Sequence, residues 1–285
     1  MHISRTISDI REQVQAFRAK GETVGLVTTM GALHEGHLSL VSEARTAHDR
    51  VVATIFVNPT QFGNASDLEN YPRTEVEDIA KLEAAGGDVV FIPEVAEIYP
   101  AGDETFVETT RLANMLHGLV RPGHFRGVAT VVTKLFNIVQ ADAAYFGEKD
   151  YQQLQVIRRM VRDLHIPISI RGVATVREPD GLAMSSRNVR LSGEDRIAAR
   201  VLSQALDHAE TVVASSTDVT TLSNQIASII ASEPRARLKG LDITEATSLG
   251  PISGPIDRPI AIMLSVAFGD GASEVLLIDQ REITP

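Results

Sequence analysis

The spacing of hydrophobic and polar positions changes repeatedly along roughly the first 175 residues. Runs of apolar and β-branched residues predict strands at 24–28, 51–57, 88–92, 143–146 and 168–173. Apolar residues at helical spacing predict helices at 8–19, 37–47, 74–85, 127–139 and 151–164. The nearly continuous apolar run Val51–Val57 is typical of a strand that is covered on both faces. This alternation predicts an α/β fold, a Rossmann-like doubly wound parallel sheet.

The rest of the chain follows a different order. Helices are expected at 192–213 and 218–232, with Ser192 and Asp218 as N-caps. Shorter strands are expected at 241–245, 259–267 and 274–278, with glycines between them. We therefore expect a Rossmann-like domain at 1–175 and a smaller α+β domain at 176–285.

Composition favours a globular protein of the reducing cytoplasm. The chain has 285 residues, of which 44% are hydrophobic and none is cysteine. No apolar run approaches the ~20 residues that a membrane span needs, and the first residues lack the apolar core of a signal peptide. We expect a cytoplasmic location and no membrane partner.

The charge balance argues against a nucleic-acid partner. The formal net charge is −10, whereas proteins that coat nucleic acid are normally basic or carry a basic face. Several cationic side chains nevertheless gather in the segments discussed below, namely Arg121, His124, Arg126, Lys134, Lys149, Arg177 and Arg187. Local cations in an acidic protein indicate a small anionic ligand, although ordinary surface charge is the alternative.

The segment Thr29–His37, T-M-G-A-L-H-E-G-H, lies where a predicted strand ends and a predicted helix begins. A helix N-terminus suits phosphate, because its backbone N–H groups and dipole are positive, and two imidazoles add donors. A metal site is an alternative, since His34 and His37 lie about 60° apart around a helix. Zinc proteases use a spacing of four instead, and no cysteine or second histidine pair accompanies this one. A purely structural turn is the third interpretation.

Three further motifs also follow predicted strands. They are N-P-T-Q-F at 58–62, G-E-K-D at 147–150 and the loop V-R-E-P-D-G-L-A-M-S-S-R at 176–187. Ligands of open parallel sheets bind at the carboxyl ends of the strands, where the strand order reverses. We therefore expect the four motifs to contribute to one nucleotide site.

The ordered set H-E-G-H, F-V-N-P-x-Q-F, Y-P-R-T, R-P-G-H-F-R-G-V, F-G-E-K-D-Y-Q-Q-L and D-G-L-A-M-S-S-R-N resembles the pantothenate synthetase (pantoate–β-alanine ligase) family. The resemblance covers residues 24–191 and implies membership of the H-x-G-H nucleotidyltransferases. It implies that ATP activates pantoate as pantoyl adenylate, and that β-alanine then gives pantothenate, AMP and pyrophosphate. It also implies Mg²⁺ with the ATP, a homodimer, and ATP, pantoate and β-alanine as small-molecule partners.

The resemblance also implies which residues form the site. ATP would bind Met30, Gly31, Ala32, Leu33, His34, Glu35, Gly36, His37, Gly147, Glu148, Lys149, Asp150, Val176, Met184, Ser185, Ser186 and Arg187. The catalytic groups among them would be His34, His37, Lys149, Ser185, Ser186 and Arg187. Gln61 and Gln153 would hold pantoate, with Gln61 also near β-alanine, and loop capping is the alternative for Gln61. Arg121 and His124 would order the wall of the site or contact substrate directly.

The chemistry of these residue types suits such a reaction. Attack by a carboxylate on a triphosphate brings two anions together, so fixed positive groups must neutralise charge first. One such donor is typically worth ~3–4 kcal/mol. The metal ligands are not identified, although Glu77 and Asp78 are possible outer-shell partners.

Three residues depart from the family pattern: Thr28 replaces a usual proline, Thr60 a frequent methionine and His117 a common glutamate. Another small-molecule adenylyltransferase, a class I tRNA synthetase and an inactive ATP-binding module are the rival functions. Another adenylyltransferase would lack the combined N-P-x-Q-F and F-G-E-K-D motifs. A class I tRNA synthetase would need a basic RNA-binding domain, which this acidic chain lacks. An inactive ATP-binding module could lose G-E-K-D or M-S-S-R, and both are present here.

Overall fold

The computed structural model describes residues 1–63 and 68–285. The chain forms two compact units. Unit 1 comprises Met1–Gly147 and Gln152–Val173, and unit 2 comprises Glu148–Tyr151 and Ala174–Pro285. The short segment Glu148–Tyr151 therefore belongs to the unit formed by the C-terminal residues. No helix within the described residues is long and apolar enough to cross a membrane.

Unit 1 is built on a six-stranded parallel sheet with the order β1-β4-β3-β2-β5-β6. Its strands are β1 (His2–Ser4), β2 (Val24–Thr29), β3 (Arg50–Ile55), β4 (Val89–Phe91), β5 (Ala143–Gly147) and β6 (Ser169–Val173). The chain moves outward from β2 through β3 to β4, and later from β5 to β6 on the other side of β2. This confirms the doubly wound parallel sheet and places the reversal of strand order between β2 and β5.

Helices connect these strands. The longer ones are α1 (Ile7–Arg18), α2 (Glu35–Ala47), α4 (Glu75–Ala84), α7 (His124–Val139) and α8 (Tyr151–Asp163). Short turns of helix are α5 (Val95–Ile98), α6 (His117–Val120), η1 (Pro59–Gln61), η2 (Leu112–Asn114) and η3 (Glu148–Asp150). Leu40 of α2 and Leu82 of α4 share one buried cluster with Val27 and Ala53 of the sheet, so α2 and α4 cover the same face. Right-handed crossovers place α8 on the opposite face.

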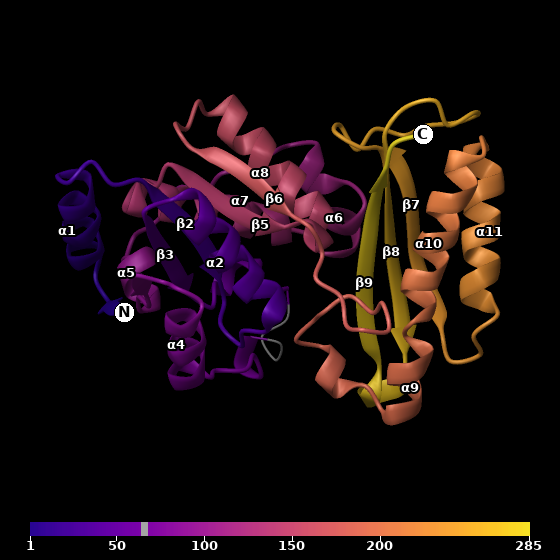
Figure 1. Cartoon of the computed structure of the whole chain (residues 1–285), viewed down its shortest axis with the longest axis horizontal. Coiled ribbons are helices and arrows are strands. Elements are labelled where there is room, and N and C mark those ends of the chain that lie inside the picture. The colour runs from indigo at the N-terminus through magenta and orange to yellow at the C-terminus, as the bar shows by residue number, and fades with distance from the viewer. Residues whose placement is uncertain (64–67) are drawn as a thin grey trace. The chain divides into compact units, whose positions relative to one another are not determined.

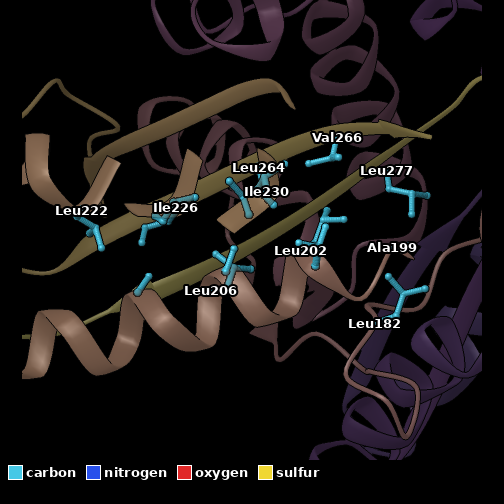
Figure 2. Packing of buried hydrophobic residues seen from close by; sticks show 14 of the residues in the cluster. Leu182, Ala199, Leu202, Leu206, Leu222, Ile226, Ile230, Leu264, Val266 and Leu277 are labelled. Carbon is cyan, nitrogen blue, oxygen red and sulfur yellow. The ribbon is translucent and has the colours of Figure 1, made fainter. Parts of the chain in front are cut away.

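Unit 2 contains a three-stranded antiparallel sheet with two long helices along one face (Figure 1). The strands are β7 (Arg237–Glu245), β8 (Ile260–Phe268) and β9 (Val275–Ile283), and the helices are α9 (Gly193–Ala198), α10 (Val201–Ala214) and α11 (Val219–Ala231), with η4 (Asn188–Arg190) and η5 (Gly271–Ser273). Figure 2 shows Leu206 of α10 and Ile226 of α11 packed against Leu264 of β8. This confirms the predicted smaller α+β fold.

Local chemistry explains where the helices of unit 2 begin and end. The Ser192 hydroxyl accepts from the Asp195 N–H at 3.1 Å, and the Asp218 carboxylate accepts from the Thr220 N–H at 2.9 Å, so both predicted N-caps are confirmed. The single helix predicted at 192–213 is wrong, because a turn at Ala199–Arg200 divides it into α9 and α10. Strand β1 was not predicted, and β7 and β9 are longer than the predicted strands.

Candidate active site

The turn between β2 and α2 carries the first predicted motif. Gly31 and Ala32 both have positive φ, +84° and +53°, so the chain reverses sharply after Met30. A Cβ on Gly31 would lie 3.1 Å from a carboxylate oxygen of Asp78, which explains the need for glycine there. The structure therefore places this turn at the carboxyl end of β2, as the sequence predicts.

The two histidines close the start of α2. Nδ1 of His34 accepts the Gly36 N–H at 3.2 Å, and Nδ1 of His37 accepts the His34 N–H at 3.4 Å. A backbone N–H can only donate, so in a neutral ring the proton lies on Nε2. The ring centroids are 4.1 Å apart. In the neutral form each imidazole therefore has an Nε2–H donor, which is the polarity that an anion requires.

Gln61 lies in the turn η1, which follows β3. Its Oε1 accepts from Nδ2 of Asn58 at 3.0 Å, and its Nε2 donates to Sδ of Met30 at 3.0 Å. The structure thus brings Gln61 and the first residue of the predicted ATP segment together. Asn58, not Gln61, caps η1, because its Oδ1 accepts the Thr60 N–H at 3.3 Å.

Asn58, which supports Gln61 and caps η1, was not singled out by the sequence predictions. It is 1% exposed and also receives a hydrogen bond of 2.8 Å from the Tyr99 hydroxyl. Helix α7 packs closely on the same turn, since a Cβ on Gly127 would lie only 2.5 Å from the Thr60 carbonyl oxygen. An asparagine and proline directly after a buried strand were the signal for this cap.

His124 and Arg121 hold the other side of Gln61. Nδ1 of His124 lies 2.9 Å from the Gln61 carbonyl oxygen, and Nη1 of Arg121 lies 3.2 Å from Nε2 of His124. Because a guanidinium only donates, Nε2 accepts and Nδ1 carries the proton. These contacts order the wall around Gln61.

The neighbouring glutamines of α8 differ in role. Gln152 is buried, and its Nε2 donates to the Leu112 and Met115 carbonyls at 2.9 and 2.7 Å, while its Oε1 accepts the His117 N–H at 3.1 Å. These hydrogen bonds use only the backbone of residue 117, so they do not depend on whether its side chain is histidine or the glutamate common in the family pattern. Gln153, the predicted pantoate ligand, is half-buried beside it.

Lys149 belongs to unit 2, together with Glu148 and Asp150. Its Nζ donates to the Met184 carbonyl at 2.9 Å, so two of the predicted ATP segments meet within this unit. Desolvation by burial lowers the pKa of Lys149, the positive charge of Arg187 lowers it further, and Asp150 and Asp279 oppose the shift. A bound phosphate would add to the counter-charge of Asp150 and Asp279 and further favour the ammonium form.

The loop at 176–187 is anchored at its base and open at its tip. The Met184 N–H donates to the Val176 carbonyl at 2.9 Å, and Arg177 pairs with the buried carboxylate of Asp279 at 2.7 Å. At the tip, the Arg187 N–H donates to the Ser185 hydroxyl at 3.2 Å. Ser186 and Arg187 are exposed. The tip therefore presents two hydroxyls and a guanidinium.

The predicted ATP residues divide between the units. Residues 30–37 and Gly147 belong to unit 1, and Glu148, Lys149, Asp150, Val176 and 184–187 belong to unit 2. No group of three or more His, Cys, Asp or Glu side chains with metal-ligand geometry occurs among the described residues. A depression of about 470 Å³ in unit 1 contains none of the predicted site residues; it is lined by residues of α2, β5 and β6 and by their flanking residues His48 and Asp142.

Comparison with known proteins identifies the family. The family model for Pantoate-beta-alanine ligase matches residues 2–282. Pantothenate synthetase of Rhizobium meliloti (strain 1021) is 49% identical over 286 residues, which cover 100% of this chain and 97% of that protein. Pantothenate synthetase of Cereibacter sphaeroides is 58% identical over 207 residues, which cover 73% of this chain and 74% of that protein.

Solved structures agree in fold and sequence. Pantothenate synthetase from Thermus thermophilus matches with a TM-score of 0.92 and 44% identity, covering 100% of both chains. The pantoate–β-alanine ligase of Francisella tularensis, complexed with β,γ-ATP and β-alanine, matches with a TM-score of 0.76 and 35% identity, covering 99% of this chain and 97% of that one. This chain belongs to the pantoate–β-alanine ligase family.

Proposed function

We propose that this enzyme condenses pantoate with β-alanine through a pantoyl-adenylate intermediate, giving pantothenate, AMP and pyrophosphate. Family membership supports the ligase activity. The observation that carries the adenylate route is the pair of imidazoles at the start of α2, whose Nδ1 atoms are occupied and whose Nε2 atoms are donors. Donors of this kind suit the phosphates of ATP.

In the first step, a carboxylate oxygen of pantoate attacks the α-phosphorus of ATP. The new P–O bond forms as the bond to the β-phosphate oxygen breaks, and the electron pair leaves with pyrophosphate. His34 and His37 would hydrogen-bond the phosphates, and the ammonium of Lys149 would neutralise charge on the leaving group. The Ser185 and Ser186 hydroxyls and Arg187 would add donors from the loop. His37 stabilises the leaving pyrophosphate without transferring a proton.

In the second step, the amine of β-alanine attacks the acyl carbon of pantoyl adenylate. The C–N bond forms, the bond from the acyl carbon to the AMP oxygen breaks, and one proton passes to solvent. No serine or cysteine nucleophile is required, because binding both substrates side by side supplies the needed proximity. Gln61 and Gln153 would hold pantoate, since a neutral amide both donates and accepts.

We further propose that Mg²⁺ enters with ATP and that the enzyme is a cytoplasmic homodimer. When bound, Mg²⁺ neutralises and orients the phosphate oxygens, and such an ion is held largely by substrate phosphates and water. Of the two acidic residues of α4 considered for the outer shell, Glu77 is exposed and Asp78 is buried. Glu77 is therefore the one suited to contact the ion through water. Light scattering on purified protein tests the dimer, and a monomer mass at all concentrations would exclude it.

The test is exchange of labelled pyrophosphate into ATP. We expect exchange that requires pantoate and does not require β-alanine, because adenylate formation is reversible before the amine arrives. The His37→Ala variant should lose about a hundred- to a thousandfold in exchange rate. Its melting temperature should fall only slightly, because the lost ring also accepts the His34 N–H. Exchange without pantoate, or formation of ADP, would exclude the proposed route.

A further inference from the structure

We propose that Asp78 of α4 is a positioning residue for adenylate formation. Its buried carboxylate holds the turn at 31–33 in the conformation from which His34 and His37 reach the nucleotide. This inference rests on the proposed function, which it deepens by naming the group that sets the geometry of the two imidazoles. In this proposal Asp78 acts through the backbone of the turn and contacts neither substrate nor metal.

Asp78 is hydrogen-bonded to the backbone of the turn through both carboxylate oxygens. Oδ2 accepts the Ala32 N–H at 2.9 Å, and Oδ1 accepts the Leu33 N–H at 2.8 Å. The Thr74 hydroxyl donates to Oδ2 at 3.0 Å. The residue is 0% exposed, so water does not compete for these bonds. Both carboxylate oxygens are engaged with the turn or with Thr74, and burial separates them from bulk water, so we assign Asp78 to the turn rather than to the outer shell expected for magnesium.

The backbone of the turn needs such a partner. Gly31 and Ala32 have φ of +84° and +53°, and a non-glycine residue at positive φ is uncommon. Successive N–H groups in such a turn converge and form an anion-binding concavity. Here the anion is the chain's own carboxylate, 46 residues away in sequence. The turn is therefore built around Asp78 rather than around a phosphate.

Helix α4 holds the turn at a second point. Nζ of Lys81, three residues after Asp78, donates to the Leu33 carbonyl at 2.7 Å. Both polar groups of the Leu33 backbone are thus fixed by α4. Leu33 directly precedes His34, the N-cap of α2, whose N–H is bonded to the His37 ring. A displacement of Leu33 must therefore move both imidazoles.

The test compares Asp78→Asn with Glu83→Gln. An asparagine offers one acceptor and turns its NH₂ group toward an N–H donor, so one bond to the turn is lost. Glu83 is a carboxylate of the same helix that pairs with the N-terminal amine of Met1, so Glu83→Gln controls for the loss of charge. We expect a fall of about a hundredfold in the kcat of pantoate-dependent exchange for Asp78→Asn, with KM for ATP within about threefold. Glu83→Gln should stay near wild type.

Amide hydrogen exchange provides a readout that does not depend on activity. At a temperature where both variants are folded, residues 31–34 should exchange at least about tenfold faster in Asp78→Asn and at the wild-type rate in Glu83→Gln. The apparent Mg²⁺ requirement should be unchanged. A raised Mg²⁺ requirement, or normal kcat despite faster amide exchange, would overturn the inference. Wild type without pantoate-dependent exchange would instead overturn the proposed function.

A second pair of variants applies if Asp78→Asn does not fold. Lys81→Met removes only the bond to the Leu33 carbonyl, and we expect a fall of about tenfold in kcat. Lys81→Arg keeps a donor on a long side chain and should restore most of the rate. Equal activity of Lys81→Met and wild type would contradict the proposal.

Discussion

The turn at 30–34 in unit 1 and the loop at 176–187 in unit 2 both carry residues expected to bind phosphate, yet they are held differently. The Ala32 and Leu33 N–H groups of the first are bonded to a buried carboxylate, and the histidine rings that follow it are bonded to the backbone. The tip of the second, around Ser186 and Arg187, is exposed, and its fixed contacts lie at its base.

This difference separates two ways of binding an anion. Donors that are fixed before the ligand arrives need no reorganisation at the moment of reaction. An exposed tip with hydroxyls and a guanidinium can instead adapt to the ligand, at an entropic cost when it becomes ordered. We therefore expect the turn to be rigid before a ligand binds, and we propose that the loop tip becomes ordered when substrates bind.

The largest expected effect tests the charge that unit 2 contributes. Lys149→Met keeps much of the side-chain volume and removes the ammonium. Because the ammonium is a full charge held by burial, whereas the other proposed contacts are neutral donors or the guanidinium of the exposed Arg187, we expect kcat for exchange to fall about a thousandfold. Lys239→Met, which removes an exposed lysine that lies 3.5 Å from Glu274, is the control. Turnover of Lys149→Met within tenfold of wild type would remove Lys149 from the site.

The same variant tests the pKa of Lys149. Burial lowers this pKa below its ordinary value of 10.5, so between the two values the unfolded chain binds more protons than the folded one. The free energy of unfolding of wild type relative to Lys149→Met should therefore rise with pH across that window. Catalysis requires the charged form and should fall as pH rises through the lowered pKa. Urea unfolding at several pH values measures the free-energy difference between the two proteins. A difference that falls as pH rises would contradict a lowered pKa of Lys149.

The base of the loop should matter for stability rather than for rate. Arg177→Met would leave the buried Asp279 carboxylate without its partner, and we expect the free energy of unfolding to fall by about 3 kcal/mol. Arg258→Met breaks a fully exposed pair with Asp257 and should leave the free energy of unfolding nearly unchanged. Urea denaturation measures both, and equal losses would show that the anchor is unimportant.

The tip of the loop should respond to ligand. Limited proteolysis between residues 184 and 190 should slow several-fold when ATP and pantoate are added together, because closure protects the mixed anhydride from water. ATP alone should protect less. Cleavage that is equally fast with and without both substrates would exclude closure.

The smallest expected effect concerns Thr60. Its hydroxyl lies 3.0 Å from Oδ1 of Asn58 and 3.2 Å from the Tyr99 hydroxyl. Thr60→Met would remove both contacts of this hydroxyl but leave the hydrogen bond from Tyr99 to Asn58, so kcat and KM should change by less than about threefold. A tenfold change in KM for pantoate would show that Thr60 sets the orientation of Gln61.

Local patterns predicted much of the fold but not the contacts that join distant segments. The periodicity of residues 24–173 was enough for the parallel sheet. Strand β1 was missed because three residues are too few for a period. The break at Ala199–Arg200 contains no proline or glycine, so no sequence signal marks it.

In the candidate site, too, local patterns predicted positions but not the contacts between distant segments. Residues adjacent to strand ends, such as Gln61 and His34, were predictable from position. The partnership of Asp78 with the turn at 31–33 was not, because 46 residues separate the carboxylate from the Ala32 N–H that it accepts. The grouping of Lys149 with the C-terminal unit likewise depends on tertiary packing, which no local pattern encodes.

The most direct test of the account follows oxygen from pantoate. Pantoate labelled with ¹⁸O in both carboxylate oxygens is incubated with unlabelled ATP and β-alanine. Attack of the carboxylate on the α-phosphorus predicts one ¹⁸O in AMP and one in the amide carbonyl of pantothenate. Mass spectrometry of AMP from a single turnover reads this out. AMP without label, or label in inorganic phosphate, would contradict an acyl adenylate and with it the assigned roles of His34, His37 and Lys149.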